Sequence, residues 1–150
     1  MTELKTGDPA PDFELPDQDG RPVRLSQFRG KRAVVIFFYP KDDTTGCTIE
    51  ACRFRDDYAR FQAAGAEVLG ISNDSPASHL RFRSKFNLPF TLLTDAGGRV
   101  RKLYGVKKTF GILPGRASYT IDRDGIVRHV FSSQSQPAKH VEEALRTLSA

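Results

Sequence analysis

Two cysteines, Cys47 and Cys52, are the only thiols in the chain. Cys47 follows a short polar loop and precedes a segment in which apolar residues recur at three- and four-residue spacing, so it should lie where a loop enters a helix. Backbone N–H groups at a helix start lack partners within the helix, and the helix dipole favours negative charge there. A thiol in this position should ionise more readily than a free cysteine. The sequence therefore predicts a nucleophilic thiolate at Cys47.

The spacing of the two cysteines adds a second argument. On an ideal α-helix, residues five positions apart are separated by a rise of about 7.5 Å, and their Cα atoms lie about 8.6 Å apart. Disulfides rarely join Cα atoms more than about 6.8 Å apart. A Cys47–Cys52 bond would therefore require the first turns of the helix to unwind, which suits a redox cycle better than a permanent cross-link.

The residues on either side of this loop predict the elements that hold it. The continuous apolar run Ala33–Phe38 is typical of a central strand that is buried on both faces. The helix after Cys47 should end near Gly65, because glycine commonly terminates helices. Its apolar face should consist of Ala51, Phe54, Tyr58 and Phe61.

The rest of the chain alternates predicted strands and helices. The predicted strands are two short ones within 14–25 around an Asp-Gly turn, Ala66–Ser72, Phe90–Thr94, and the hairpin Ala117–Ile121 with Ile126–Phe131. The predicted helices are a short coil at Ser26–Gly30, a helix opened by Asn73–Pro76 and ending before Pro89, a short one at Gly98–Tyr104, and a last one from Pro137. Lys107–Gly115 is predicted to be a loop. This order indicates one α/β domain over residues 1–150, with a central mixed sheet flanked by helices.

Length and composition limit the kind of protein. The 150 residues suffice for one domain, and 39% hydrophobic with 27% charged residues is typical of a globular protein. No apolar run approaches the roughly 20 residues of a membrane span, and the start of the chain lacks the apolar stretch of a signal peptide. We therefore expect a cytoplasmic protein with no membrane partner, in which two cysteines serve catalysis or metal binding rather than a structural disulfide.

The net charge of +5 raises the question of an acidic partner. The basic residues are scattered without interleaved aromatic residues, so we expect a solvated surface and no nucleic-acid partner. The three histidines, His79, His129 and His140, do not make a zinc spacing with the cysteines, and we expect them at the surface.

The loop around Cys47 carries a family resemblance. Pro40, Thr44 and Cys47 fit the peroxiredoxin pattern Pro-x-x-x-Thr-x-x-Cys, and the segment Cys47–Cys52 resembles the peroxiredoxin Q branch, also called bacterioferritin comigratory protein, with its atypical two-cysteine chemistry. Matching flanks extend the resemblance over nearly the whole chain: Gly7–Phe13, Phe38–Asp43, Gly115-Arg116 and Tyr119–Asp122. Thr45 departs from the branch, whose members commonly carry proline there, and this places the rigidity of the loop in question.

The resemblance implies a thioredoxin-like fold with an N-terminal extension and a peroxidase that reduces hydrogen peroxide and organic hydroperoxides. It assigns Cys47 as the nucleophile, Cys52 as the resolving thiol and Arg116 as a cation that contacts Cys47. A thioredoxin or glutaredoxin-type dithiol would reduce the resulting disulfide. We expect a monomer that needs no metal or organic cofactor.

Two residues of the loop, and a third in the helix, have alternative explanations. Thr44 could direct its hydroxyl at the sulfur or at a bound peroxide, or it could cap the helix. Pro40 could shield the thiolate from water, or it could only end the strand. Glu50 could join the polar network of the site or remain a solvated carboxylate.

Two other functions remain open from the residues alone. One is a redox-controlled interaction or chaperone-like protein, in which the disulfide reshapes a surface. The other is a basic nucleic-acid-binding module, which a steep salt dependence of DNA binding would reveal.

Overall fold

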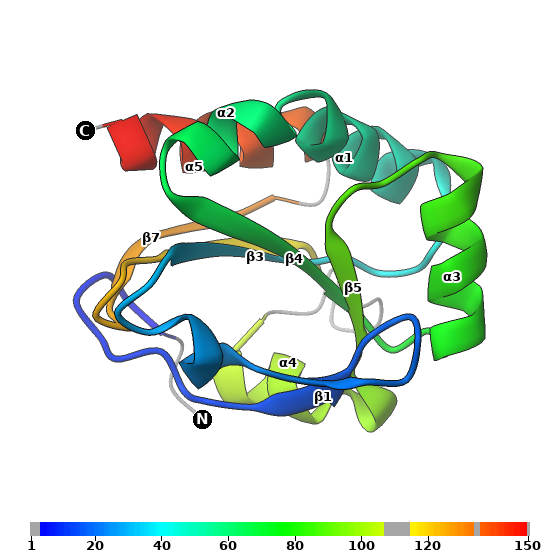
Figure 1. Cartoon of the computed structure of the whole chain (residues 1–150), viewed down its shortest axis with the longest axis horizontal. Coiled ribbons are helices and arrows are strands. Elements are labelled where there is room, and N and C mark those ends of the chain that lie inside the picture. Colours follow the sequence, from blue (N-terminus) through cyan, green and yellow to red (C-terminus); the bar gives the residue numbers. More distant parts are fainter. Residues whose placement is uncertain (1–3, 107–114, 134–135, 150) are drawn as a thin grey trace.

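The apolar run Ala33–Phe38 forms β3, the central strand of a five-stranded sheet with the order β5-β4-β3-β6-β7. A computed structural model describes residues 4–106, 115–133 and 136–149 (Figure 1). All six residues of β3 are buried, as expected for a strand covered on both faces. β3 pairs in parallel with β4 (Ala66–Ser72) and antiparallel with β6 (Ala117–Ile121), so the predicted mixed sheet is confirmed.

The remaining elements follow the alternation expected from the sequence. The other strands are β1 (Glu14–Pro16), β2 (Pro22–Arg24), β5 (Thr91–Thr94) and β7 (Val127–Ser132). The helices are α1 (Thr45–Asp56), α2 (Tyr58–Ala63), α3 (Pro76–Lys85), α4 (Arg99–Tyr104) and α5 (Pro137–Ser149), with 3-10 helices at Leu25–Phe28 and Ala96–Gly98. β1 and β2 form the separate antiparallel hairpin predicted around the Asp-Gly turn. The predicted loop at Lys107–Gly115 falls, except for Gly115, outside the described residues.

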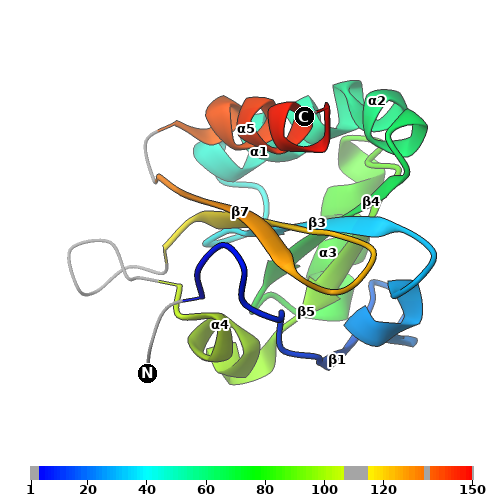
Figure 2. The same cartoon turned by 90° about the vertical axis from the view of Figure 1, so that its left-hand side faces the viewer.

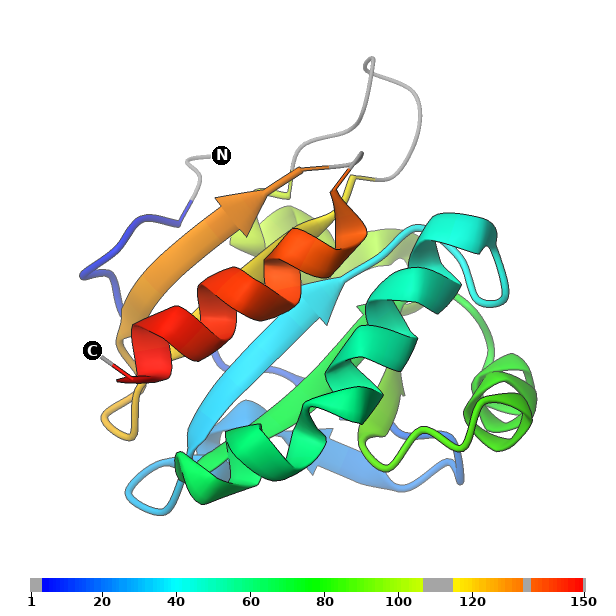
Figure 3. The same ribbon diagram turned by 90° about the horizontal axis from the view of Figure 1, so that it is seen from above.

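Helices and the N-terminal segment cover opposite faces of the sheet. α1, α2 and α5 lie together on one face, and α4 and the β1–β2 hairpin lie on the other (Figure 2). Seen from above, α1 and α5 lie side by side over the sheet and run roughly along its strands, and α3 stands at the β5 edge (Figure 3). No helix among the described residues is both long enough and apolar enough to cross a lipid bilayer.

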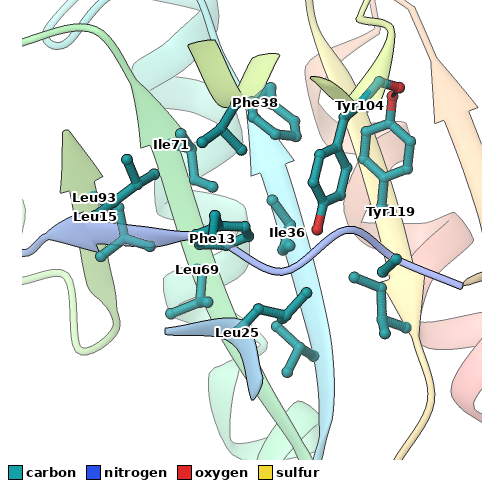
Figure 4. Close-up of a cluster of buried hydrophobic side chains, with 14 of the residues drawn as sticks. Phe13, Leu15, Leu25, Ile36, Phe38, Leu69, Ile71, Leu93, Tyr104 and Tyr119 are labelled. Atoms are coloured by element: carbon teal, nitrogen blue, oxygen red, sulfur yellow. Dashed lines mark hydrogen bonds between the residues drawn. The ribbon is translucent and has the colours of Figure 1, made fainter. Parts of the chain in front are cut away.

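Each face has its own hydrophobic core. Under the N-terminal segment, side chains such as Phe13, Ile36, Phe38 and Tyr104 form one cluster (Figure 4). Under the helices, the second cluster contains Phe37, Phe54 and Phe61 together with Cys47. Alternate residues of β3 point to opposite faces, so one strand supports both clusters.

The helix after Cys47 differs from its predicted form in one respect. The sequence predicts one helix that continues to Gly65, but Asp57 (φ −101°, ψ 7°) interrupts it and separates α1 from α2. The Asp57 N–H donates to Arg53 O, and the Asp57 carbonyl accepts from Arg60 N and Phe61 N, so one residue ends α1 and begins α2. The Asp57 side chain does not cap α2; its carboxylate lies near Arg53 of α1 and Arg60 of α2.

Helix termini elsewhere agree with the sequence signals. Ser75 is the N-cap of α3, and its hydroxyl accepts a hydrogen bond from Ser78 N at 3.1 Å. Gly105 ends α4 in the left-handed conformation at φ +74°, where a side chain would be strained.

Candidate active site

Cys47 lies in the first turn of α1, directly above the carboxyl end of β3. Thr44 is the N-cap of the helix, so Cys47 is its third helical residue and lies in the first turn, where backbone N–H groups lack partners within the helix. The side chain is 1% exposed and packs in the cluster with Phe37 and Tyr39. The predicted position at a loop-to-helix junction is confirmed, and the setting favours an anionic sulfur.

Arg116 is the cation that meets this sulfur. Its Nη2 donates to Cys47 Sγ at 3.4 Å, and its Nη1 donates to Glu50 Oε1 at 2.5 Å. Sheet register explains the meeting of residues so far apart in sequence. Ala117 of β6 lies opposite Phe38 of β3, so Arg116 sits beside the start of the loop that leads to Cys47.

The Arg116 guanidinium is buried between two acidic groups. Arg116 is 4% exposed, and its Nε has no hydrogen-bond partner among the described residues. Burial alone lowers the pKa of Arg116, but Glu50 and Cys47 raise it, and the net shift is upward. A permanent positive charge is thus held against the sulfur, with planar N–H groups that suit bidentate contacts.

Glu50 is part of the site rather than a solvated carboxylate. It is 0% exposed, and burial raises its pKa to about 8, although Arg116 acts in the opposite direction. Its Oε2 lacks a hydrogen-bond partner within the part of the chain that the structure covers, and it lies 3.7 Å from His140 Nδ1. Glu50 and Cys47 therefore share one cation, Arg116.

His140 of α5 closes the buried network behind Glu50. Its Nε2 lies 2.8 Å from Ser133 O, and its Nδ1 lies 2.6 Å from Ser118 Oγ. Burial lowers the pKa of His140 to about 4, and the Ser133 carbonyl opposes that shift. A neutral ring satisfies both contacts when Nε2–H donates to the carbonyl and Nδ1 accepts from the Ser118 hydroxyl.

Cys52 lies five residues, or about 1.4 turns, beyond Cys47 on the same helix. Both thiols are free, and Cys52 is partly exposed whereas Cys47 is buried. Because α1 is continuous from Thr45 to Asp56, the geometry of an intact helix separates the two sulfurs. The assignment of Cys52 as the resolving thiol stays a prediction, and it requires α1 to open.

Thr44 and Pro40 lie close to Cys47 along the chain, but their predicted roles are not visible here. Thr44 is exposed, and its hydroxyl donates to Lys41 O at 2.9 Å. No hydrogen bond from Thr44 to the Cys47 sulfur, and none that caps α1, is formed within residues 4–106. Pro40 is half-buried and follows β3 directly. The role of each in binding peroxide or excluding water stays a prediction.

A second buried network fixes the loop between β3 and α1. Asp42 Oδ1 accepts from Tyr39 OH at 2.5 Å, and Asp42 Oδ2 accepts from Ser78 Oγ at 2.8 Å and lies 2.7 Å from His79 Nδ1. The Asp42 N–H donates to Asp74 Oδ2 at 2.8 Å. The loop is therefore attached to the start of α3 as well as to its own strand.

The predicted surface position is wrong for two histidines. His79 and His140 are both 0% exposed, and His129 is half-buried beside Glu143 at 3.1 Å. Their polar atoms are matched by buried acceptors and hydroxyls, which offsets the cost of burial. The sequence held a signal, because His79 lies three residues before buried Phe82 on α3, and His140 lies four before buried Ala144 on α5.

Comparisons with known proteins agree with this geometry. Residues 6–130 match the model of the AhpC/TSA family. The chain is 54% identical to "Peroxiredoxin Q, chloroplastic" of Sedum lineare, over 99% of this chain and 80% of that protein. The rice protein of the same name is 53% identical over 97% of this chain and 67% of its own length.

Solved structures add the same similarity in three dimensions. Peroxidoxin BcpB of Mycobacterium tuberculosis has a TM-score of 0.90 at 41% identity, covering 98% of this chain and 97% of that one. A bacterioferritin comigratory protein of Xanthomonas campestris has a TM-score of 0.80 at 28% identity, covering 92% of each chain. A buried cysteine–arginine pair at a helix start, set in this fold and in these sequences, assigns the chain to the peroxiredoxin Q branch of the AhpC/TSA family.

Proposed function

We propose that this peroxiredoxin reduces hydrogen peroxide and organic hydroperoxides through Cys47, and that Cys52 resolves the oxidised sulfur. The observation that best supports this proposal is the hydrogen bond between Arg116 Nη2 and Cys47 Sγ. A cation that cannot lose its proton stabilises negative charge on the sulfur that it contacts.

In the first step, the Cys47 thiolate attacks one oxygen of the peroxide. The O–O bond breaks, Cys47 becomes a sulfenic acid, and the departing oxygen leaves as water or an alcohol after it takes up a proton. Negative charge moves from sulfur to the departing oxygen. Because Arg116 can donate to both, its interaction is strongest when the charge is spread between them, which lowers the barrier.

In the second step, the Cys52 thiol condenses with the Cys47 sulfenic acid and releases water. The disulfide that forms is incompatible with the intact helix between the two residues. The first turns of α1 must therefore unwind before or during this step. Cys52 is already partly exposed, whereas Cys47 is buried.

The last step regenerates the two thiols. A dithiol protein of the thioredoxin or glutaredoxin type attacks the disulfide, forms a mixed disulfide and leaves oxidised. Alkyl peroxide reduction is the activity ascribed to the bacterioferritin comigratory protein of Xanthomonas campestris, which supports organic hydroperoxides as substrates here. Each step uses only protein thiols and peroxide, so we propose that no metal or organic cofactor takes part.

We further propose a monomer that works in the cytosol. The reactive groups Cys47, Glu50 and Arg116 all come from one chain, so the site is assembled without a second copy. Sedimentation at micromolar concentration and cell fractionation test the two points separately.

The central experiment measures peroxide consumption by wild type and by Cys47→Ser in the presence of a reduced thioredoxin system. We expect multiple turnovers for wild type and none for Cys47→Ser. A Cys47→Ser protein that consumes peroxide at the wild-type rate would contradict the proposal.

A further inference from the structure

Arg101 of α4 lies where the two strands that carry the site separate. β3 and β6 are paired as far as Phe38 and Ala117. Beyond that pair, the segment after β3 leads to Cys47, and the segment before β6 contains Arg116. Where the two strands separate, Arg101 Nη2 donates to Tyr39 O at 2.8 Å, and Arg101 Nη1 donates to Gly115 O at 2.5 Å. One guanidinium thus joins the residue before Pro40 to the residue before Arg116.

These two carbonyls need a donor. Main-chain groups that leave a sheet lose their ladder partners, and a buried carbonyl without a donor is costly. The planar fork of an arginine presents two parallel N–H groups, so it can satisfy both carbonyls and fix the distance between them. A lysine could keep the charge, but its single ammonium could not set that geometry.

The helix that carries Arg101 is itself firmly placed. Asp95 is 2% exposed, and its carboxylate accepts from Val100 N at 3.0 Å and from Arg101 N at 2.9 Å. Val100 and Tyr104 are fully buried and anchor α4 in the core under the sheet. The Arg101 guanidinium also lies over the Phe38 ring, 5.7 Å from its centre. The donor is therefore rigid relative to the strands that it joins.

Arg101 is also within electrostatic range of the nucleophile. Burial lowers the pKa of Arg101, while Asp95 and Cys47 oppose that shift. No hydrogen bond between Arg101 and Cys47 is formed in the described parts of the chain, whereas Arg116 makes one. The contacts of Arg101 are with the backbone of the site rather than with the reacting atoms.

From this arrangement we propose that Arg101 is a positioning residue of the peroxidase site. It sets the separation between the Tyr39–Pro40 segment and the Gly115–Arg116 segment, and so places the Arg116 guanidinium for peroxide. The inference rests on the proposed function, because it concerns the reaction of Cys47 with peroxide. Misplacement of a reacting group by about 1 Å can slow a reaction by about a hundredfold, so this role is measurable.

The test compares two reactions of the same sulfur in wild type, Arg101→Lys and Arg101→Gln. The first is the rate constant with hydrogen peroxide, measured by competition with a haem peroxidase for limiting peroxide. The second is alkylation of Cys47 by iodoacetamide, a neutral reagent that needs a nucleophilic sulfur but not the peroxide geometry. Trypsin releases both cysteines in the segment 42–53, and fragmentation of this peptide distinguishes Cys47 from Cys52.

We expect the peroxide rate constant to fall about ten- to hundredfold in both variants, while Cys47 alkylation changes less than about threefold. Arg83→Lys is the matched control, because Arg83 Nε also donates to a main-chain carbonyl, Phe90 O at 3.1 Å, but on α3. Arg83→Lys should have the wild-type rate constants for both peroxide reaction and Cys47 alkylation. Melting followed by circular dichroism sets a temperature at which every variant is folded.

Two outcomes would overturn the proposal. A wild-type peroxide rate in Arg101→Lys would show that charge alone matters. Equal losses in peroxide reaction and alkylation would show a general disturbance of the sulfur rather than positioning. Failure of the proposed function is distinguishable from both, because wild type and Arg83→Lys would then not react with peroxide at all.

Discussion

Gly46 and Arg116 lie so close together that a Cβ atom on Gly46 would stand 2.9 Å from Arg116 Nη2. A flexible arginine could move away from such a contact. The guanidinium of Arg116 cannot do so without loss, because Glu50 and Cys47 hold it. The missing side chain at residue 46 is therefore what allows the cation to reach the sulfur.

The first prediction follows from this contact. Gly46→Ala should displace the Arg116 guanidinium and lower the peroxide rate constant at least tenfold. The same substitution replaces glycine in the first turn of a helix by the best helix former, worth up to about 1 kcal/mol of stability. Stopped-flow or competition kinetics should show a slower reaction with peroxide. Urea unfolding should show that the variant is no less stable than wild type.

Thr45→Ala is the control for this prediction. Thr45 is exposed in the same turn, so alanine improves helix propensity there without approaching Arg116. It should leave the peroxide rate within about twofold. An unchanged rate in Gly46→Ala would mean that the close approach is not needed.

The second prediction concerns the shape of the Arg116 side chain. Arg116→Lys keeps a positive charge but cannot donate to Glu50 and Cys47 from one plane. The second-order rate constant with hydrogen peroxide should fall well over tenfold with the fold retained. Arg128→Lys, which alters an exposed arginine paired with Asp122, is the matched control and should react as wild type does. Equal rates in all three proteins would remove Arg116 from the mechanism.

The third prediction concerns pH and the buried carboxyl of Glu50. Its pKa is raised from 4.5 to about 8 on folding, so the folded state binds more protons than the unfolded state across that interval. The stability contributed by this group is complete below pH 4.5 and is lost as pH rises to about 8. His140, whose pKa is lowered from 6.5 to about 4, acts in the opposite sense, since its contribution is present above pH 6.5 and lost toward pH 4.

The effects of these two groups separate between pH 6.5 and 8, where the contribution of His140 is constant and that of Glu50 still falls. In a Cys47→Ser background, which leaves one buried acid beside Arg116, the free energy of unfolding should decrease over this interval. Glu50→Gln in the same background should remove most of the decrease. Urea unfolding at a series of pH values measures both. If the free energy of unfolding changes with pH in the same way with and without Glu50→Gln, Glu50 stays ionised throughout.

The fourth prediction concerns the opening of α1. Oxidised protein should contain an intramolecular Cys47–Cys52 bond, and amides of residues 45–53 should exchange faster than in the reduced protein. Mass spectrometry of the disulfide and hydrogen exchange in both redox states measure this. Identical protection of the segment in the two states would exclude an unwinding mechanism.

Cys52→Ser tests the same mechanism by kinetics. It should still consume one equivalent of peroxide, because the first step belongs to Cys47. Turnover with a thioredoxin system should then largely stop, and the sulfenic acid should become prone to over-oxidation. Full turnover by Cys52→Ser would indicate a one-cysteine peroxidase.

Local patterns predicted most of the fold. The six apolar residues of β3 identified the central strand, and Asp122–Gly125 identified the β6–β7 hairpin. The break at Asp57 was not predicted, because the apolar spacing continues across it and α1 and α2 bury one common face. Periodicity reports which face is buried, and it does not report whether the backbone is continuous.

The site was predictable in part. The position of Cys47 followed from local sequence, but its pairing with Arg116 depends on sheet register across 69 positions, and only the family resemblance indicated it. The burial of Glu50 is a tertiary effect, since the carboxylate is enclosed by Arg116 and by α5. The spacing of His140 from Ala144 could have indicated its burial, but its partners Ser118 and Ser133 lie on other elements and have no local sign in the sequence.

The stacked rings of Phe37 and Phe54, 4.5 Å apart, anchor α1 beyond Cys52, so unwinding during oxidation can stop short of Phe54. The part that must open still contains buried Glu50 and Ala51, and their packing favours the reduced, helical form. A fold that stabilises the dithiol raises the reduction potential of the disulfide, by about 30 mV for each 1.4 kcal/mol. How tightly one turn of helix packs therefore determines how strong an oxidant the protein becomes, and how easily a partner dithiol can return it to its starting state.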